Sequence, residues 1–114
     1  MVMAFNKKAE FSKKDQKAAE VAKVLSHPAR IAILKTIAKR GVCVCGEIVA
    51  ILPLAQSTIS NHLKELLDAG LISGELDGLN CCYCINWAAI KKSHKAILDV
   101  FLELENREGM DCCK

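Results

Sequence analysis

The chain has 114 residues, of which 52% are hydrophobic and 25% are charged, so one folded domain with a single hydrophobic core is expected. This composition excludes disordered, collagen-like and low-complexity chains. The formal net charge of +3 is spread unevenly: residues 1–40 carry ten Lys and Arg against three Asp and Glu, whereas residues 41–80 carry one against five. Because the middle of the chain is acidic, charge alone does not indicate a nucleic-acid binder, and such a role has to rest on a motif.

The sequence predicts a soluble, cytoplasmic protein with no membrane partner. No apolar run reaches the roughly 18 residues that a membrane span requires, and residues 1–8 lack the apolar segment of a secretory signal. Seven cysteines are present, an odd number, and nothing marks secretion. Reduced thiols that act as ligands or sensors are therefore favoured over a framework of disulfides.

Two helices are expected near the N-terminus, after a polar and basic tail over residues 1–11. Ser12 and Asp15 form a variant of the capping box, which predicts that the first helix begins near residue 13. Pro28 suits the first turn of a second helix, because its missing N–H would be unpaired there in any case. Gly41 ends this second helix.

A second pair of helices is expected in the middle of the chain. A short helix over residues 46–51 is followed by a turn of about four residues, since Pro53 disfavours helical geometry in the residue before it. Residues 56–69 repeat apolar side chains at helical spacing, which predicts an amphipathic helix. Gly70 closes that helix as a left-handed cap.

The C-terminal third predicts a hairpin and a long helix. Residues 71–76 and 81–85 are expected to form two strands around Asp77-Gly78, a pair that tolerates the positive backbone angles of a tight turn. A fifth helix is expected over residues 87–106, and residues 107–114 form a tail that carries two cysteines. The folded domain would thus comprise residues 12–106.

A short helix, a turn, an amphipathic helix and a two-stranded hairpin follow one another in the order of a winged helix-turn-helix domain of the α+β class. The N-terminal half of the amphipathic helix carries short hydrogen-bonding side chains that suit base edges and phosphates in a major groove. These candidate DNA-binding residues are Gln56, Ser57, Thr58, Ser60, Asn61 and His62. An ordinary solvated face is the alternative, but it would be richer in Lys and Glu. Lys64 is the one cation on this helix, so neutralisation of phosphates is expected to depend also on Arg30 and the basic N-terminal residues.

Three segments carry a resemblance to a known family: Leu25-Ser26-His27-Pro28-Ala29-Arg30-Ile31, Gln56-Ser57-Thr58-Ile59-Ser60-Asn61-His62-Leu63 and Ala69-Gly70-Leu71-Ile72. Through them, residues 24–86 resemble the ArsR/SmtB family of metal-responsive bacterial repressors. The resemblance implies five helices with a two-stranded wing, a homodimer joined through its first and last helices, and a repressor of double-stranded operator DNA that is not an enzyme. Two positions depart from the family. Ala55 stands where the family usually has a serine that caps the recognition helix, and the missing cap lowers the stability of that helix by about 1 kcal/mol. The wing tip over residues 77–80 lacks the arginine that is usual in the family.

The motif Cys43-Val44-Cys45, expected at the start of the third helix, matches the family motif that supplies two thiolates in sensors of arsenite, antimonite, cadmium and lead. Soft ions prefer sulfur donors. The resemblance therefore implies Cys43 and Cys45 as ligands of an As(III) or Sb(III) inducer, with Cd(II) or Pb(II) as alternatives. Ile48 occupies the position of the third cysteine of the arsenite sensors. We expect the third donor to come from Cys112 or Cys113, because a flexible tail brings a thiol to a distant site at modest entropic cost.

A second thiol pair is expected on the second wing strand. Cys81, Tyr83 and Ile85 share one face of that strand and Cys82 and Cys84 share the other. The aromatic and aliphatic members indicate that the first of these faces is buried.

The sequence thus favours a dimeric repressor that a thiophilic metal(loid) releases from its operator. One alternative keeps the repressor but makes the cysteines a redox or persulfide switch. A thiol oxidoreductase is disfavoured because no base or nucleotide-binding loop accompanies the cysteines, and a protein-interaction module would need aromatic anchors on the amphipathic helix. Asp99 on the last helix has no histidine partner in register, so a zinc site of the family's other type is not expected.

Overall fold

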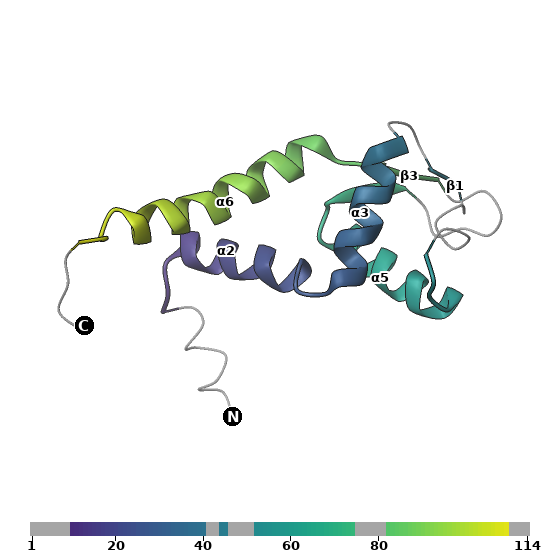
Figure 1. The fold of residues 1–114 in the computed structure, drawn as a ribbon, viewed down its shortest axis with the longest axis horizontal. Helices are drawn as coiled ribbons and strands as arrows, with labels where there is room; N and C mark the ends of the chain where they lie inside the picture. The colour runs from purple at the N-terminus through teal and green to yellow at the C-terminus, as the bar shows by residue number, and fades with distance from the viewer. Residues whose placement is uncertain (1–9, 41–43, 46–51, 75–81, 110–114) are drawn as a thin grey trace, which may run out of the picture. The chain divides into compact units, whose positions relative to one another are not determined.

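A computed structural model of the chain describes residues 10–40, 44–45, 52–74 and 82–109. Its elements, in chain order, are α2 (Lys13–Val24), α3 (Pro28–Arg40), β1 (Val44–Cys45), α5 (Gln56–Asp68), β2 (Ile72–Gly74), β3 (Cys82–Ile85) and α6 (Trp87–Glu105) (Figure 1). The chain divides into two compact units, one formed by Val24–Ile90 and the other by Met1–Lys23 with Lys91–Lys114.

The core of the larger unit lies between α3, α5 and the sheet. It consists of apolar side chains at helical or alternating spacing, namely Ile33, Ile37, Ile59, Leu63, Leu66, Leu71, Ile72 and Tyr83. Ile33, Ile59 and Leu66 are fully buried. Since burial of each such side chain contributes roughly 1.5 to 3 kcal/mol, this cluster fixes the recognition helix α5 against α3.

The helix ends follow the predicted signals. The backbone N–H of Asp15 donates to Ser12 Oγ at 3.1 Å, which confirms Ser12 as the cap of α2. His27 Nδ1 accepts from the N–H of Ala29 at 3.1 Å and so caps α3 beside Pro28. Ala55 supplies no side-chain hydrogen bond to α5, as its replacement of serine predicts. Gly70, beyond the end of α5, has a φ of +80°.

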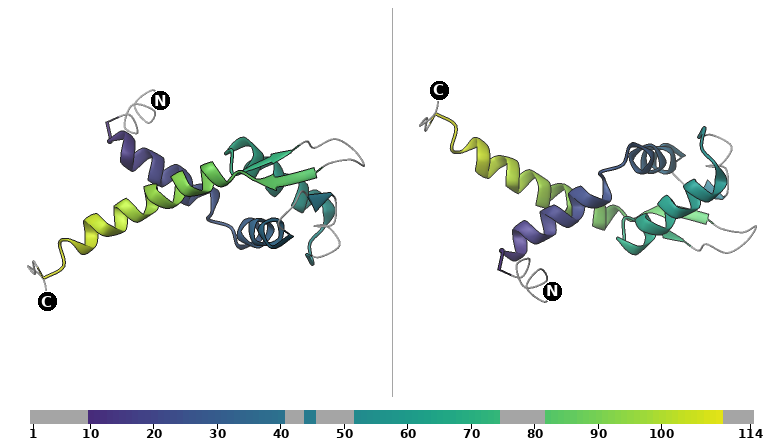
Figure 2. Two further views of the ribbon diagram at one scale, coloured as in Figure 1. Left: turned by 90° about the horizontal axis from the view of Figure 1, so that it is seen from above. Right: turned by 90° about the horizontal axis from the view of Figure 1, so that it is seen from below.

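The wing strands β2 and β3 are antiparallel, with Ile72 opposite Ile85 and Gly74 opposite Tyr83. Figure 2 shows them side by side in both views. This confirms the hairpin prediction in its described part, while the predicted turn at residues 77–78 lies outside the described residues.

A third strand corrects the prediction for the cysteine motif. Val44 and Cys45 do not begin a helix but form β1, which pairs antiparallel with β3 and gives the sheet the order β1-β3-β2. The physical reason is that β3 would otherwise present an edge of unpaired backbone groups. Valine, which is β-branched, also favours extended backbone. The helix predicted over residues 46–51 lies outside the described residues.

Asn86 joins the sheet, the recognition helix and the start of α6. Its side-chain oxygen caps α6 by accepting from the N–H of Ala89 at 3.2 Å. Its side-chain nitrogen donates to the carbonyl oxygen of Gly70 at 3.0 Å, and its backbone N–H donates to that of Leu71 at 3.0 Å. The residue that follows β3 is therefore tied to the end of α5.

The smaller unit contains α2 and the part of α6 that begins at Lys91. Ala18 and Val21 of α2 are buried. Large apolar side chains of α6 are exposed, with exposed fractions of 41% for Leu98, 55% for Phe101 and 63% for Leu104. Within the described residues, no helix is both long and apolar enough to cross a membrane.

Candidate nucleic-acid interface and thiol sites

The recognition helix α5 has one buried and one exposed side. The buried side holds Ile59, Leu63 and Leu66. The exposed side holds five of the residues predicted to contact DNA, which are Gln56, Ser57, Ser60, Asn61 and Lys64, while Thr58 is half-buried. Ser57, Asn61 and Lys64 follow one another at spacings of four and three residues, so they form a single stripe along the helix. We call these three residues the polar stripe.

His62 does not belong to that exposed side, which corrects its prediction as a DNA-facing residue. Its side chain is only 8% exposed. The ring lies 4.4 Å from the His27 ring, measured between centroids. His62 Nδ1 accepts a hydrogen bond from Arg30 Nε at 3.2 Å. His62 is thus a packing residue that connects α5 to the start of α3.

Arg30 acts as a clamp between the two helices of the motif. Besides its bond to His62, its Nη1 group donates to the carbonyl oxygen of Val24 at 3.3 Å. Arg30 is half-buried, and the planar fork of its guanidinium fixes the direction of each donated bond. This clamp holds the polar stripe in a defined orientation, and a phosphate contact by Arg30 stays a prediction.

The environment of His62 disfavours its protonated form. Burial is the main cause that lowers the pKa of His62 below its ordinary value of 6.5, and the positive charges of His27 and Arg30 act in the same direction, while Glu65 opposes them. The bond from Arg30 requires an unprotonated Nδ1, so protonation of that nitrogen would break the clamp.

We therefore expect the stability of the fold to fall in mild acid. Because the pKa of His62 is lowered in the folded chain, this side chain takes up its proton in the unfolded chain first as the pH drops below 6.5. The contribution of His62 to the free energy of unfolding therefore decreases as the pH drops from that value through the lowered pKa. Urea unfolding of wild type and of His62→Gln at several pH values measures this, and the variant should show a flatter pH dependence. His94→Gln is the matched control because His94 is exposed. An unchanged slope for His62→Gln would contradict the assignment.

The cysteines among the described residues lie on the paired strands β1 and β3. Cys45 lies directly opposite Cys82 in the ladder. Cys82 and Cys84 are half-buried, and each belongs to a disulfide. Tyr83 between them is only 2% exposed, which confirms that the opposite face of β3 is the buried one.

The other predicted thiol ligands, Cys43, Cys112 and Cys113, lie outside the described residues. Among the described residues, no group of three or more Cys, His, Asp or Glu side chains is placed to hold a metal ion.

Sequence reasoning missed the roles of His62 and Asn86, although each had a signal. His62 stands three residues after Ile59 and four before Leu66, so it occupies a buried position of the apolar pattern. Asn86 immediately precedes a helix, where asparagine is a favoured cap.

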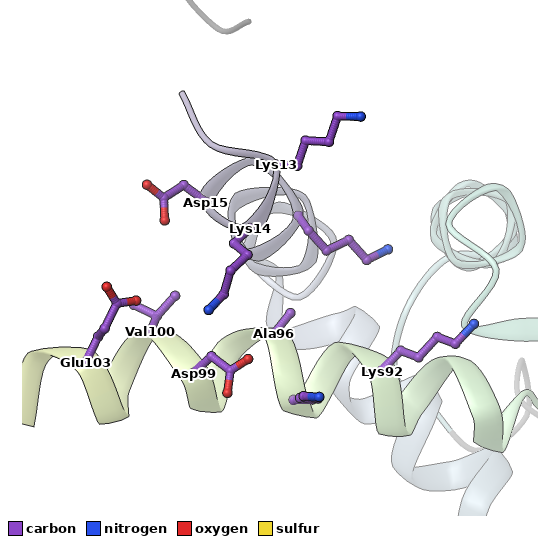
Figure 3. Close-up of a pocket in the computed structure, with 10 residues that line it drawn as sticks. Lys13, Lys14, Asp15, Lys92, Ala96, Asp99, Val100 and Glu103 are labelled. Atoms are coloured by element: carbon purple, nitrogen blue, oxygen red, sulfur yellow. The ribbon is translucent and has the colours of Figure 1, made fainter. Parts of the chain in front are cut away.

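Two grooves run between α2 and α6 in the smaller unit. One, of about 330 Å³, is lined by lysines of both helices together with Asp15, Asp99 and Glu103. Figure 3 shows Lys14 extending from α2 toward the acidic side chains of α6. Because both signs of charge alternate there, this groove is not a site for one kind of ion. The other groove, of about 390 Å³, is lined mainly by apolar side chains, including Ala18, Ile97 and Phe101.

Known proteins that are similar to this chain are transcriptional regulators of the helix-turn-helix type. The model of the arsR family of bacterial regulatory proteins matches residues 27–73, which span α3 to β2. An uncharacterized HTH-type transcriptional regulator of Methanocaldococcus jannaschii is 42% identical over 66 residues, which cover 57% of this chain and 73% of that protein. The arsenical resistance operon repressor of Bacillus subtilis is 40% identical over 65 residues, which cover 56% of this chain and 61% of that protein.

A solved ArsR-like transcriptional regulator from Rhodococcus sp. RHA1 superposes with a TM-score of 0.63 at 24% identity, over 80% of this chain and 85% of that one. This likeness shows the fold, and the fold is the predicted winged helix-turn-helix.

Proposed function

Because this chain belongs to the ArsR family of DNA-binding transcriptional regulators, we propose that it is a dimeric repressor that leaves its operator when a thiophilic metal(loid) binds its cysteine thiolates. Members of the family are regulators and not enzymes, as the sequence predicts. The observation that carries the proposal is the polar stripe of α5, which is exposed and is held in place from the opposite side of the helix by the core.

The polar stripe suits a major groove in both chemistry and position. Asn61 carries one amide donor group and one acceptor, the pattern that reads adenine. Lys64, one turn further along, suits a phosphate. Ser57 lies in the first turn, where free backbone N–H groups and the positive end of the helix dipole also attract phosphate. The stripe thus combines base reading with backbone positioning.

Asn61→Ala is expected to weaken binding to the operator far more than binding to random DNA. A side chain that contacts a base edge discriminates by about 1 to 3 kcal/mol, which is roughly a 5-fold to 150-fold loss of operator affinity. Gel-shift titrations on both DNAs at one salt concentration measure the difference. Equal losses on the two DNAs would contradict this placement. Lys64→Ala is the matched control, because it should weaken binding to every sequence and flatten the salt dependence.

The dimer is proposed to form through the apolar surface of the smaller unit. Leu98 and Phe101 are exposed on α6, and the apolar groove beside Phe101 continues this surface toward α2. Contiguous exposed apolar side chains on a small domain indicate a surface that a partner covers. The proposed occupant is a second copy of this chain, because one α5 per subunit then reads one half of a symmetric operator.

We expect sedimentation equilibrium at micromolar concentration to give about twice the 12.5 kDa of one chain. Phe101→Glu should shift the protein toward the monomer, because it introduces a charge into the apolar surface. A wild-type mass near 12.5 kDa would contradict the dimer.

The proposed inducer is arsenite or antimonite, bound through Cys43 and Cys45. Thiolates fit these soft ions better than carboxylates or imidazoles would. Support comes from the Bacillus subtilis relative, whose name concerns arsenical resistance. Cys112 and Cys113 are the proposed tail donors, and cadmium and lead ions are the alternative inducers.

A gel shift on the DNA upstream of the chain's own gene, with arsenite, antimonite, cadmium, lead, zinc or peroxide added, tests the whole proposal. We expect a retarded complex in the absence of inducer and its release by arsenite or antimonite. No retarded complex would contradict the repressor, and a complex that resists both metalloids would contradict the inducer.

The second candidate keeps the repressor but uses oxidation as the signal. The observation that favours it is that Cys82 and Cys84 each belong to a disulfide. The same assay separates the two candidates, since a redox repressor would be released by peroxide and not by arsenite.

A further inference from the structure

A polar contact between Arg30 and His62 joins the two helices of the DNA-reading motif. Arg30 Nε donates to His62 Nδ1 at 3.2 Å, and Arg30 Nη1 donates to the carbonyl oxygen of Val24 at 3.3 Å. Because the guanidinium is planar and rigid, one fork makes both bonds and fixes where the imidazole lies. His62 is buried, so water does not readily replace the bond that it accepts.

The direction of this bond determines the protonation state of His62. A guanidinium keeps its protons in proteins and can only donate. His62 Nδ1 is therefore the accepting nitrogen of a neutral imidazole, and the ring proton is on Nε2. Protonation of Nδ1 would set two N–H donors and two positive charges against each other. The bond thus exists only while the ring is neutral.

Charged and titratable groups from both helices of the motif act on His62. The His27 ring, just before α3, lies 4.4 Å from the His62 ring, Arg30 is in the first turn of α3, and Glu65 is one turn further along α5. Burial and the positive charges of His27 and Arg30 lower the pKa of His62, whereas Glu65 raises it. Acid is therefore needed to break the bond.

His62 directly follows Asn61 of the polar stripe. Successive residues lie about 100° apart around a helix, so the His62 ring faces α3 while Asn61 is exposed. A turn of α5 that moves His62 away from Arg30 also moves Asn61. A base-edge contact depends on the direction of the amide, whereas a lysine on a flexible stem still reaches a phosphate after a small shift.

We propose that the bond between Arg30 and His62 positions the polar stripe for base reading, and that protonation of His62 in acid breaks this bond and lowers the preference for the operator over random DNA. Both residues are positioning residues, because they act through Asn61. The inference rests on the proposed function and deepens it, since it adds regulation by protons to the same interface.

The expected direction is opposite to the ordinary effect of acid on DNA binding. Acid adds positive charge to a protein and so strengthens its binding to the phosphates of any sequence. Loss of the bond between Arg30 and His62 weakens base reading alone. The ratio of the affinities for operator and random DNA, which we call the operator preference, therefore isolates the effect.

Fluorescence anisotropy titrations of the full-length protein measure the operator preference at falling pH. The two DNAs are the sequence upstream of the chain's own gene and a random sequence, at one salt concentration, with a thiol reductant and no added metal(loid). The operator preference of wild type should fall by about tenfold or more while circular dichroism still shows the folded chain. Tenfold corresponds to about 1.4 kcal/mol, which is the order of a hydrogen bond with a charged partner.

The chain has three histidines, and one variant of each makes the assignment specific. His62→Asn puts an amide oxygen in the place of Nδ1, which accepts from Arg30 but does not titrate, so its operator preference should become nearly independent of pH. His94→Gln is the matched control, because His94 is exposed on α6, and it should keep the wild-type fall. His27→Asn keeps a capping side chain but removes a charge that lowers the pKa of His62, so its fall should occur at higher pH.

Two further measurements test the bond itself. Heteronuclear NMR of the imidazole rings, without DNA, should find His62 Nδ1 unprotonated near neutral pH and should find its protonation over the pH range in which the operator preference falls. Arg30→Lys keeps the positive charge but lacks the planar fork, so it should lower the operator preference already at neutral pH.

The outcomes separate this inference from the proposed function. A wild-type operator preference that stays constant down to the pH of unfolding, or that falls equally in His62→Asn, would overturn the inference while the proposed repressor stands. Protonation of His62 at a pH different from that of the fall would also overturn it, and this measurement decides the question if His62→Asn does not fold. The lack of any operator preference at neutral pH would contradict the repressor and this inference together.

Discussion

Gly74→Ala is expected to disrupt the wing and to lower the free energy of unfolding by about 3 kcal/mol or more. Gly74 is the last residue of β2 and has a φ of +145°, a conformation that residues with a side chain rarely adopt. A Cβ at this position would overlap the backbone carbonyl oxygen of Cys82 and would lie 3.1 Å from Tyr83 Cδ1. Because a backbone atom of the paired strand cannot rotate away, the alanine would separate β2 from β3.

Gly70→Ala is the matched control for that prediction. Gly70 also has a positive φ, of +80°, but no described heavy atom lies within 4 Å of an added Cβ. Its replacement should therefore cost only the left-handed conformation itself, about 1 to 2 kcal/mol. Urea unfolding of both variants measures the difference, and equal losses would show that the close approach of β2 to β3 does not matter.

The helices were predictable because their signals are local. The caps and apolar periodicities that predict α2, α3, α5 and α6 lie within each segment or next to it. The strand β1 had no such signal. It is two residues long, and its partner β3 lies almost forty residues later in the chain, so only the tertiary fold determines its conformation.

The functional residues also divide into those that a local sequence signal predicts and those that only the tertiary fold determines. The exposure of Ser57, Asn61 and Lys64 follows from the helical period and was predictable. The prediction failed at His62 because its polar chemistry was given more weight than its position among buried residues. The proximity of Cys45 to Cys82 was not predictable from spacing, since it depends on a pairing between distant segments.

Serine in place of Cys43 or Cys45 is expected to leave operator binding intact and to abolish release by arsenite. A hydroxyl preserves the size and polarity of the thiol but is a poor ligand for a soft ion. An inducer acts only because it binds the DNA-incompetent conformation more tightly than the DNA-bound one. Removal of a ligand therefore removes the coupling and leaves the repressor on its operator, so release should require at least about a hundredfold more arsenite, a coupling of about 2.7 kcal/mol.

Gel shifts at increasing arsenite concentration measure this loss, with operator affinity in the absence of arsenite as the internal control. If the tail supplies the third donor, Cys112→Ser/Cys113→Ser should weaken the response, whereas Cys82→Ser/Cys84→Ser should change it little. Release of the Cys43 and Cys45 variants at the wild-type arsenite concentration would contradict the assignment of the motif. Dependence on Cys82 and Cys84 alone would place the sensor in β3, because the strand that leads into Asn86 would then bind the inducer without any donor from β1.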